Sequence, residues 1–301
     1  MDVRTQMRSA ARYNATREAI AAGDRRLTFA EAWDRGVRMA NGLLALGLKP
    51  QDRVGVLEDN TLESSDFFLG AAIANLVRVP LYPRNARDSH VHMLAHTGCR
   101  VVVVSEKYAE EIEAIRDELP DLEHILVRDS GYEAWLVRQS DLDPDPAIDP
   151  QDYFIIRHTG GTTGKSKGVA YTHHAWLAAG RDWFYLYPPV EPGDSCLHLA
   201  PISHGSGYLF TPIWLGGGRT RPLQRRAAHG QCRGDDGLRG LGLARPAPGR
   251  AGSAQPGAGA RTAARGGQRD GGAHARQPRQ ADALHLKRSR RAQCPSKDTS
   301  V

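Results

Sequence analysis

A run of glycines, hydroxyl residues and lysines at residues 158–169 is the segment best suited to chemistry. It reads His-Thr-Gly-Gly-Thr-Thr-Gly-Lys-Ser-Lys-Gly-Val. Small residues let a backbone turn tightly and direct several N–H groups at one oxyanion, while the hydroxyl groups add donors and the lysines add positive charge. The segment therefore predicts a phosphate-binding loop. Its expected phosphate ligands are Thr159, Gly160, Gly161, Thr162, Thr163, Gly164, Lys165 and Lys167.

The residues on either side distinguish two kinds of phosphate loop. A Walker loop has a glycine five residues before its Gly-Lys pair, where this chain has Thr159, and it leads directly into a helix. Here apolar residues at 153–156 and 169–172 indicate a strand before the loop and another after it. The next helix is expected only near His173, with Thr172 as its N-cap. This arrangement disfavours a P-loop nucleoside triphosphatase.

Strand and helix patterns alternate ahead of the loop. Thr28 and Glu31 form a capping-box pattern that opens a helix, and Gly47 is placed to end it. Further helices are expected at 64–74, 88–96 and 107–119, and strands at 53–57, 77–82, 101–104 and 124–127. This alternation predicts an α/β fold with a mainly parallel sheet and flanking helices. Residues 141–152 are expected to form a surface loop.

The last 83 residues differ in composition from the rest of the chain. From Arg219 to Val301, 50 residues are Arg, Ala, Gly or Pro, and Ile, Met, Phe, Tyr, Trp and Glu do not occur. Such a segment cannot bury enough apolar surface to offset its conformational entropy, so we expect a disordered tail. It holds 18 Lys and Arg against five Asp, whereas residues 1–218 hold 22 basic and 29 acidic residues. The tail lacks the aromatic residues that stack on bases, so nucleic acid is not an expected partner.

Neither a metal site nor a membrane segment is predicted. The cysteines form no C-x-x-C pair, so zinc is not expected and no metal ligand is identified. The four are Cys99, Cys196, Cys232 and Cys294. The charged N-terminus does not resemble a signal peptide, and no window approaches 18 consecutive apolar residues. A cytoplasmic protein without a transmembrane segment is therefore expected.

The loop resembles the signature loop of the adenylate-forming, or AMP-binding, superfamily, which has the pattern Thr-Ser-Gly-Thr-Thr-Gly-x-Pro-Lys-Gly-Val. Two places depart from it, since Gly160 replaces Ser and Ser166 replaces Pro. The segments at 27–32, 52–60 and 79–83 are similar to family segments that precede the loop. The resemblance is strongest to acyl-CoA synthetases, and it implies the N-terminal part of the large adenylation domain over residues 1–218.

Downstream, Pro201, His204 and Gly207 are similar to the family's P-x-x-H-x-x-G segment. The resemblance implies that His204 and Gly207 belong to the substrate pocket, where the histidine of relatives lies by the acyl group. His173 and His174 are interpreted instead as residues at a helix start. The aromatic residues between 176 and 187 are interpreted as core packing rather than an acyl pocket. They are Trp176, Trp183, Phe184, Tyr185 and Tyr187.

The resemblance also implies a reaction. A carboxylic acid, expected to be a fatty acid, attacks the α-phosphate of ATP to give an acyl-adenylate and pyrophosphate, and coenzyme A then displaces AMP. ATP, Mg²⁺ and coenzyme A are the implied cofactors and substrates. An aminoacyl or aryl acid adenylation domain is an alternative, and a non-catalytic nucleotide-binding protein with a basic arm is another. The oligomeric state is left open.

The family pattern stops at residue 218. The Tyr-Gly-x-Thr-Glu and Thr-Gly-Asp segments of relatives do not occur, nor does the C-terminal lid with its catalytic lysine. Because the composition changes at the same place, we expect residues 219–301 to be translated out of frame. Catalytic residues are therefore not assigned, and little ligase turnover is expected. Translation of the coding DNA in the other two frames tests this expectation, which requires a Tyr-Gly-x-Thr-Glu-like segment in one of them.

Overall fold

The computed structural model of the 301-residue chain describes residues 1–159, 165–203, 205–222 and 243–244. The chain divides into two compact units, Met1–Pro246 and Ala247–Val301, and every described residue lies in the first. The helices are α1 (Val3–Tyr13), α2 (Phe29–Ala45), α3 (Ser64–Ile73), α4 (Arg87–Thr97), η1 (Glu106–Tyr108), α5 (Ala109–Glu113), η2 (Arg116–Glu118), α6 (Tyr132–Val137), α7 (His173–Leu186) and α8 (Gly207–Leu215). The strands are β1 (Glu18–Ala22), β2 (Arg25–Thr28), β3 (Arg53–Leu57), β4 (Val77–Pro80), β5 (Val101–Ser105), β6 (His124–Arg128), β7 (Tyr153–His158), β8 (Gly168–Thr172), β9 (Ser195–His198), β10 (Arg219–Pro222) and β11 (Leu243–Ala244).

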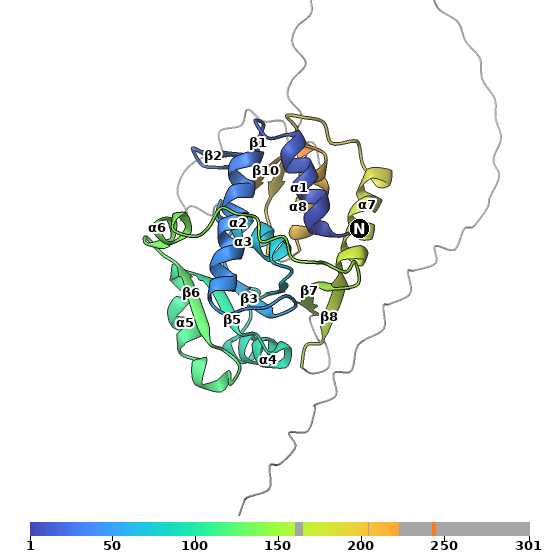
Figure 1. Cartoon of the computed structure of the whole chain (residues 1–301). Coiled ribbons are helices and arrows are strands. Elements are labelled where there is room, and N and C mark those ends of the chain that lie inside the picture. Colours follow the sequence, from blue (N-terminus) through green and yellow to red (C-terminus); the bar gives the residue numbers. More distant parts are fainter. Residues whose placement is uncertain (160–164, 204, 223–242, 245–301) are drawn as a thin grey trace, which may run out of the picture. The chain divides into compact units, whose positions relative to one another are not determined.

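A six-stranded sheet carries the glycine-rich segment at one edge. Its order is β6-β5-β3-β4-β7-β8, and every neighbouring pair is parallel except β7 and β8 (Figure 1). The four valines of β5 have no exposed surface because this strand lies inside the sheet and both its faces are covered. The predicted strands at 53–57, 77–82, 101–104, 124–127 and 153–156 are therefore confirmed as members of one mainly parallel sheet.

A smaller sheet has the order β11-β9-β10-β1-β2. Strand β10 begins at Arg219, the first residue of the expected tail, and pairs in parallel with β9 on one side and β1 on the other. Thr220 and Pro222 are buried, as the alternation of a strand with one covered face requires. The expected boundary at residue 218 thus falls at the start of a strand. Apart from β10 and β11, the predicted disordered tail lies outside the described residues.

Helices α2 and α3 pack closely against each other beside the larger sheet (Figure 1). The capping box predicted for α2 is present, because Thr28 Oγ1 accepts from the Glu31 amide and the Glu31 carboxylate accepts from the Thr28 amide. A Cβ on Gly36 would lie 2.6 Å from Leu69 Cβ, and one on Gly70 would lie 2.5 Å from Met39 Cγ. Two glycines therefore bring the helix backbones together.

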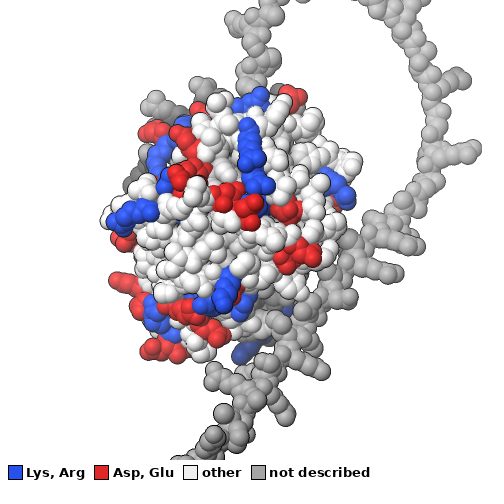
Figure 2. All heavy atoms as spheres, in the orientation of Figure 1, with Lys and Arg blue, Asp and Glu red and all other residues white. Residues whose placement is uncertain are grey.

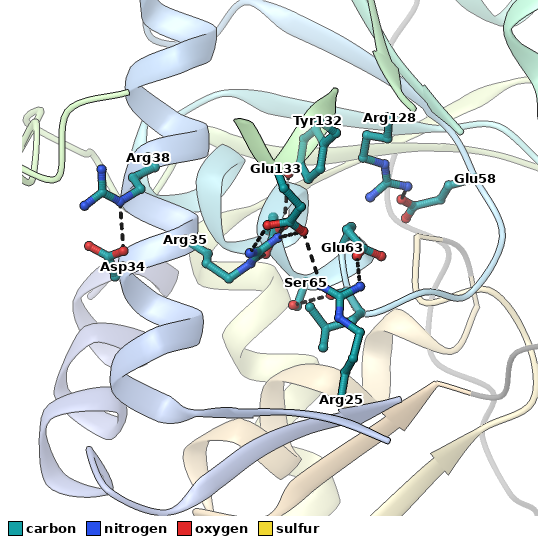
Figure 3. Close-up of polar contacts among 12 residues, drawn as sticks. Arg25, Asp34, Arg35, Arg38, Glu58, Glu63, Ser65, Arg128, Tyr132 and Glu133 are labelled. Carbon is teal, nitrogen blue, oxygen red and sulfur yellow. Dashed lines mark hydrogen bonds and ion pairs between the residues drawn. The ribbon is translucent and has the colours of Figure 1, made fainter. Parts of the chain in front are cut away.

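A network of ion pairs attaches α6 to this helix pair (Figure 3). Buried Asp66 of α3 accepts two hydrogen bonds from Arg35 of α2, at 2.9 and 2.7 Å, and one from the Tyr132 hydroxyl at 2.9 Å. Arg35 also pairs with Glu133 at 2.7 Å. Breaking such a buried network leaves an uncompensated charge, which is unfavourable. The network therefore fixes α2, α3 and α6 relative to one another.

The region predicted as one helix at 107–119 is different in the structure. It consists of η1, which continues directly into α5, and of η2, which follows after a break at residues 114–115. The apolar residues of this region still face the core, because Ile112, Ile115 and Leu119 are buried in a hydrophobic cluster with residues of β5 and α4. The sequence pattern thus identified the buried face correctly but not the regularity of the backbone.

On the face of the molecule in Figure 2, basic and acidic side chains are interspersed. No extended basic patch of the kind that binds nucleic acid is visible among the described residues of that face. In the same part of the chain, no helix combines the length and apolar character needed to cross a bilayer.

Candidate active site

The predicted phosphate loop joins the antiparallel strands β7 and β8. His158 pairs with Gly168 at the last position of the ladder, and the Thr159 amide then donates to the Lys167 carbonyl at 3.0 Å. The prediction that this segment connects two strands, rather than a strand and a helix, is confirmed. Residues 160–164, which include all three glycines expected to bind phosphate, lie outside the described residues.

The described ends of the loop are exposed. Thr159, Lys165 and Lys167 are all accessible to solvent, and neither lysine forms an ion pair with another described residue. Their ammonium groups are therefore available to an anion bound over the hairpin, where each would add charge-assisted hydrogen bonds. Their role in phosphate binding stays a prediction.

Three histidines surround the base of the loop. His92 and His96 lie one turn apart on α4 and stack with ring centroids 5.4 Å apart, and His158 of β7 meets them at 6.3 and 5.8 Å. The Nε2–H group of His92 donates to the Ser166 carbonyl at 2.8 Å, which attaches α4 to the loop. Burial, with the neighbouring His96 and His92, lowers the pKa of His158 to about 4, so its imidazole is neutral near pH 7.

Asn60, which follows β3, holds the segment that leads to α8. Its amide donates to the carbonyls of His198 at 3.0 Å and Ala200 at 2.7 Å, and its Oδ1 accepts from the Ile202 amide at 2.8 Å. Three backbone groups in residues 198–202 are thus satisfied by a single side chain from the segment after β3. His204 lies outside the described residues, so its pocket role stays a prediction.

Gly207 is the first residue of α8 and is buried. A Cβ at this position would lie 2.2 Å from the Ile202 carbonyl oxygen, which no rearrangement of a flexible side chain can relieve. Close packing of the helix start against residues 201–203 therefore requires glycine here. Its membership of a substrate pocket is a prediction that this packing does not test.

The aromatic residues predicted to pack in the core divide into two groups. Trp176 is buried, stacks on Tyr208 at 4.5 Å and donates its indole N–H to Thr211 Oγ1 at 2.9 Å. Trp183 is also buried and stacks on Tyr187. Core packing was the wrong expectation for Phe184 and Tyr185, which are 41% and 79% exposed because they lie on the outer face of α7.

The interpretation of residues 172–174 as a helix start is confirmed. Thr172 is the N-cap of α7 and its hydroxyl accepts from the Ala175 amide at 3.1 Å. His173 is fully buried, with Nδ1 accepting from the Val3 amide and Nε2 donating to Asn75 Oδ1, both at 3.2 Å. His173 therefore connects α7 with the N-terminal helix, and burial lowers its pKa to about 4.

The described residues do not form a metal site. Among them, no group of three His, Cys, Asp or Glu side chains is arranged to hold a metal ion. The two described cysteines, Cys99 and Cys196, are buried free thiols whose pKa burial raises to about 12. We therefore assign no described residue to Mg²⁺ and derive no chemical step through it.

Comparison with known proteins defines the class. A family model described as AMP-binding enzyme matches residues 7–230, which is most of the chain and nearly all of its described part. With the two sheets and the strand–loop–strand site, this shows that the chain belongs to the AMP-binding enzyme family. The N-terminal adenylation fold expected from the loop is confirmed.

The similar proteins include ligases for different acids. Long-chain-fatty-acid–CoA ligase FadD13 of Mycobacterium tuberculosis is 33% identical over 186 residues, which cover 60% of this chain and 36% of the relative. Feruloyl-CoA synthase of an Amycolatopsis species is 30% identical over 206 residues, covering 66% of this chain and 39% of the relative. The inhibitor-bound N-terminal domain of FACL13 from M. tuberculosis superposes with a TM-score of 0.70 at 27% identity, covering 74% of this chain and 57% of that one. The chain spans less than half the length of the curated relatives it matches.

Two positions near the site were not found by sequence reasoning. The contacts of Asn60 are long-range, and nothing local in the sequence indicates them. Arg78 is different, because a charged residue between Val77 and Val79 in an apolar strand is itself a visible signal.

Proposed function

We propose that this chain binds ATP at the turn between β7 and β8 and activates a carboxylic acid as an acyl-adenylate, for transfer to coenzyme A. The observation that carries the proposal is the hairpin closed by Thr159 and Lys167, with exposed Lys165 and Lys167 at its end. Attack of a carboxylate on the α-phosphate of ATP releases pyrophosphate. Donors held in place around that leaving group lower the barrier, since they stabilise charge as it develops.

The acid is proposed to be a fatty acid, with an aryl or amino acid as the alternative. Fatty-acid and feruloyl ligases are similar to this chain at comparable identity. The resemblance of Pro201, His204 and Gly207 to the family's P-x-x-H-x-x-G segment favours an acyl or aryl acid. A cytoplasmic location is proposed because the substrates, ATP and coenzyme A, are found there.

ATP–pyrophosphate exchange with a panel of fatty, aryl and amino acids tests the function. Exchange that depends on one class of acid would identify the substrate. ATP binding is required for exchange with any of these acids, and a protein that binds neither ATP nor pyrophosphate would contradict the proposal.

A further inference from the structure

Arg78 lies on β4 with a buried guanidinium group among three aromatic rings. The residue is 2% exposed, and its guanidinium carbon lies 3.7 Å from the ring centroid of Phe68, 4.5 Å from that of Phe154 and 5.6 Å from that of Trp176. Such cation–π contacts are favourable, but they leave the N–H donors free. Nε and Nη2 are buried and have no hydrogen-bond partner among the described residues.

Arg157 on β7 is a second cation on the same face of the sheet. Arg78 is in register with Ile155, and residues two apart on a strand share a face, so Arg157 lies one step further along that face. Its guanidinium carbon is 4.6 Å from the centroid of Tyr208, and its buried Nε has no partner in the described part of the chain. Burial, with the nearby charge of Arg157, lowers the pKa of Arg78 to about 9.

The charge of Glu58 acts on Arg78, but its ion pair is with another residue. Glu58 follows β3, is buried and pairs with Arg128 of β6 through one carboxylate oxygen (Figure 3), while its Oε1 has no hydrogen-bond partner among the described residues. Neither Arg78 nor Arg157 forms an ion pair with any described residue. A buried charge without an ion pair is strongly unfavourable, so buried Arg78, with half-buried Arg157 on the same face, indicates that an anion is missing.

The position of Arg157 relates the pair to the proposed site. It precedes Thr159 of the phosphate loop by two residues, and its Nη2 lies 4.0 Å from where a Cβ on Gly205 would stand. Arg157 and Tyr208 are half-buried and Gly205 is exposed, so this end of the cluster reaches the surface. Arg157 thus lies close to the described residues Thr159 and Gly205, which border the loop expected to bind phosphate and the segment expected to line the acyl pocket.

We infer that Arg78 and Arg157 bind a second carboxylate of the acid substrate, which is then a dicarboxylic acid. The inference rests on the proposed function. The carboxylate that is activated loses its charge when it becomes an adenylate, so it would leave both arginines uncompensated. A second carboxylate keeps its charge throughout. The aromatic rings that contact both guanidinium groups suit a carboxylate on an apolar body better than a polyphosphate.

Glutarate and valerate test this inference, because they have the same chain length and differ in the second carboxylate. Their affinities for the full chain are measured by calorimetry, and the melting temperature is recorded with each acid, with phosphate and with ATP at constant ionic strength. Glutarate is expected to bind and to raise the melting temperature more than valerate. Equal effects of the two acids, or stabilisation by phosphate and not by glutarate, would overturn the inference.

Three matched substitutions separate binding from structure. Arg157→Met is expected to weaken glutarate binding about tenfold or more, since charged hydrogen bonds are lost. Arg78→Met is expected to do the same and to raise the melting temperature of the ligand-free protein, because an unpaired buried charge is removed. Arg181→Met, at an exposed position on α7, should change neither quantity.

The outcomes distinguish this inference from the proposed function. A lower ligand-free melting temperature for Arg78→Met, with glutarate binding by Arg157→Met unchanged, would show that the arginines are structural. Stabilisation of the unmodified chain by ATP but not by glutarate would overturn the inference alone. Failure of ATP to bind would contradict the proposed function itself.

Discussion

The Ile202 amide donates to Asn60 Oδ1 at 2.8 Å, which joins the end of β3 in the larger sheet to the segment between β9 and α8. With the two bonds that the Asn60 amide donates to the carbonyls of His198 and Ala200, this side chain satisfies three backbone groups. The position of the segment that contains His204 therefore depends on a residue about 140 positions earlier in the chain.

Replacement of Asn60 by alanine is expected to lower the free energy of unfolding by about 2–4 kcal/mol, because buried backbone groups lose their partners. Urea denaturation measures the change. Asn41→Ala is the control, since Asn41 also donates to two backbone carbonyls, at 2.8 Å each, but in an exposed setting. Asn41→Ala should lower the free energy of unfolding by less than about 1 kcal/mol. Equal losses for the two variants would show that Asn60 has no special role.

Two glycine substitutions should act in opposite directions. Gly207→Ala places a Cβ 2.2 Å from the Ile202 carbonyl oxygen and is expected to destabilise the protein by roughly 3 kcal/mol or more. Gly180→Ala lies within α7, where the nearest atom, Thr211 Cγ2, is 3.9 Å away, and helix propensity should stabilise it by about 0.5–1 kcal/mol. The melting temperatures of the two variants test this prediction. A melting temperature for Gly207→Ala equal to that of the unmodified protein would contradict the close packing of α8.

Stability should fall as the pH is lowered from about 6.5 towards 4. Burial lowers the pKa of His158, His173 and His198 to about 4 in the folded protein, whereas an unfolded histidine has a pKa of about 6.5. Between these values the unfolded chain binds more protons, so protonation favours unfolding, and the stability from neutral histidines is complete only above about pH 6.5.

The variant His158→Leu tests this pH dependence at one position. Both ring nitrogens of His158 are buried without a partner among the described residues, so leucine removes a titrating group without removing a hydrogen bond. The loss of unfolding free energy between pH 7 and 4 should be smaller than in the unmodified protein, by about 1–3 kcal/mol. Chemical denaturation at several pH values measures how the free energy of unfolding changes with pH. An identical pH dependence for both proteins would be inconsistent with a neutral, buried His158.

Lys167→Ala should weaken ATP binding by about tenfold, since one charge-assisted contact to a phosphate is worth roughly 1.5 kcal/mol or more. It should leave the melting temperature of the ligand-free protein unchanged, because the side chain is exposed. Lys49→Ala, at an exposed position before β3, is the matched control. Calorimetric titration with ATP measures the affinity of each variant. Equal affinities for Lys167→Ala and Lys49→Ala would show that Lys167 does not contact the phosphates.

The local patterns in the sequence predicted most of the larger sheet. The four consecutive valines of β5, the capping box at Thr28 and the N-cap at Thr172 correspond to local preferences that the structure keeps. The connection between β7 and β8 was also predictable, because the apolar runs on both sides of the loop have strand character. These features depend on neighbours in the sequence, which is why the sequence alone indicates them.

Other features depend on distant partners. Helix α1 has a charged sequence and was not predicted; its apolar side, with Val3 and Met7, is buried against elements from later in the chain. Strand β10 begins with an Arg-Thr-Arg-Pro sequence that has little strand character, and it is formed by pairing with β9 and β1 on either side. The contacts of Asn60, and the positions of Arg78 and Arg157 on one face, likewise require the assembled sheets. The loop glycines and His204 lie outside the described residues.

Titration of the full chain with ATP and with adenosine tests the central claim most directly, because the two ligands differ only in the phosphates that the turn between β7 and β8 is proposed to hold. The account predicts that ATP binds and raises the melting temperature, and that adenosine binds at least about tenfold more weakly. Equal affinity for the two ligands, or no binding of ATP, would contradict it.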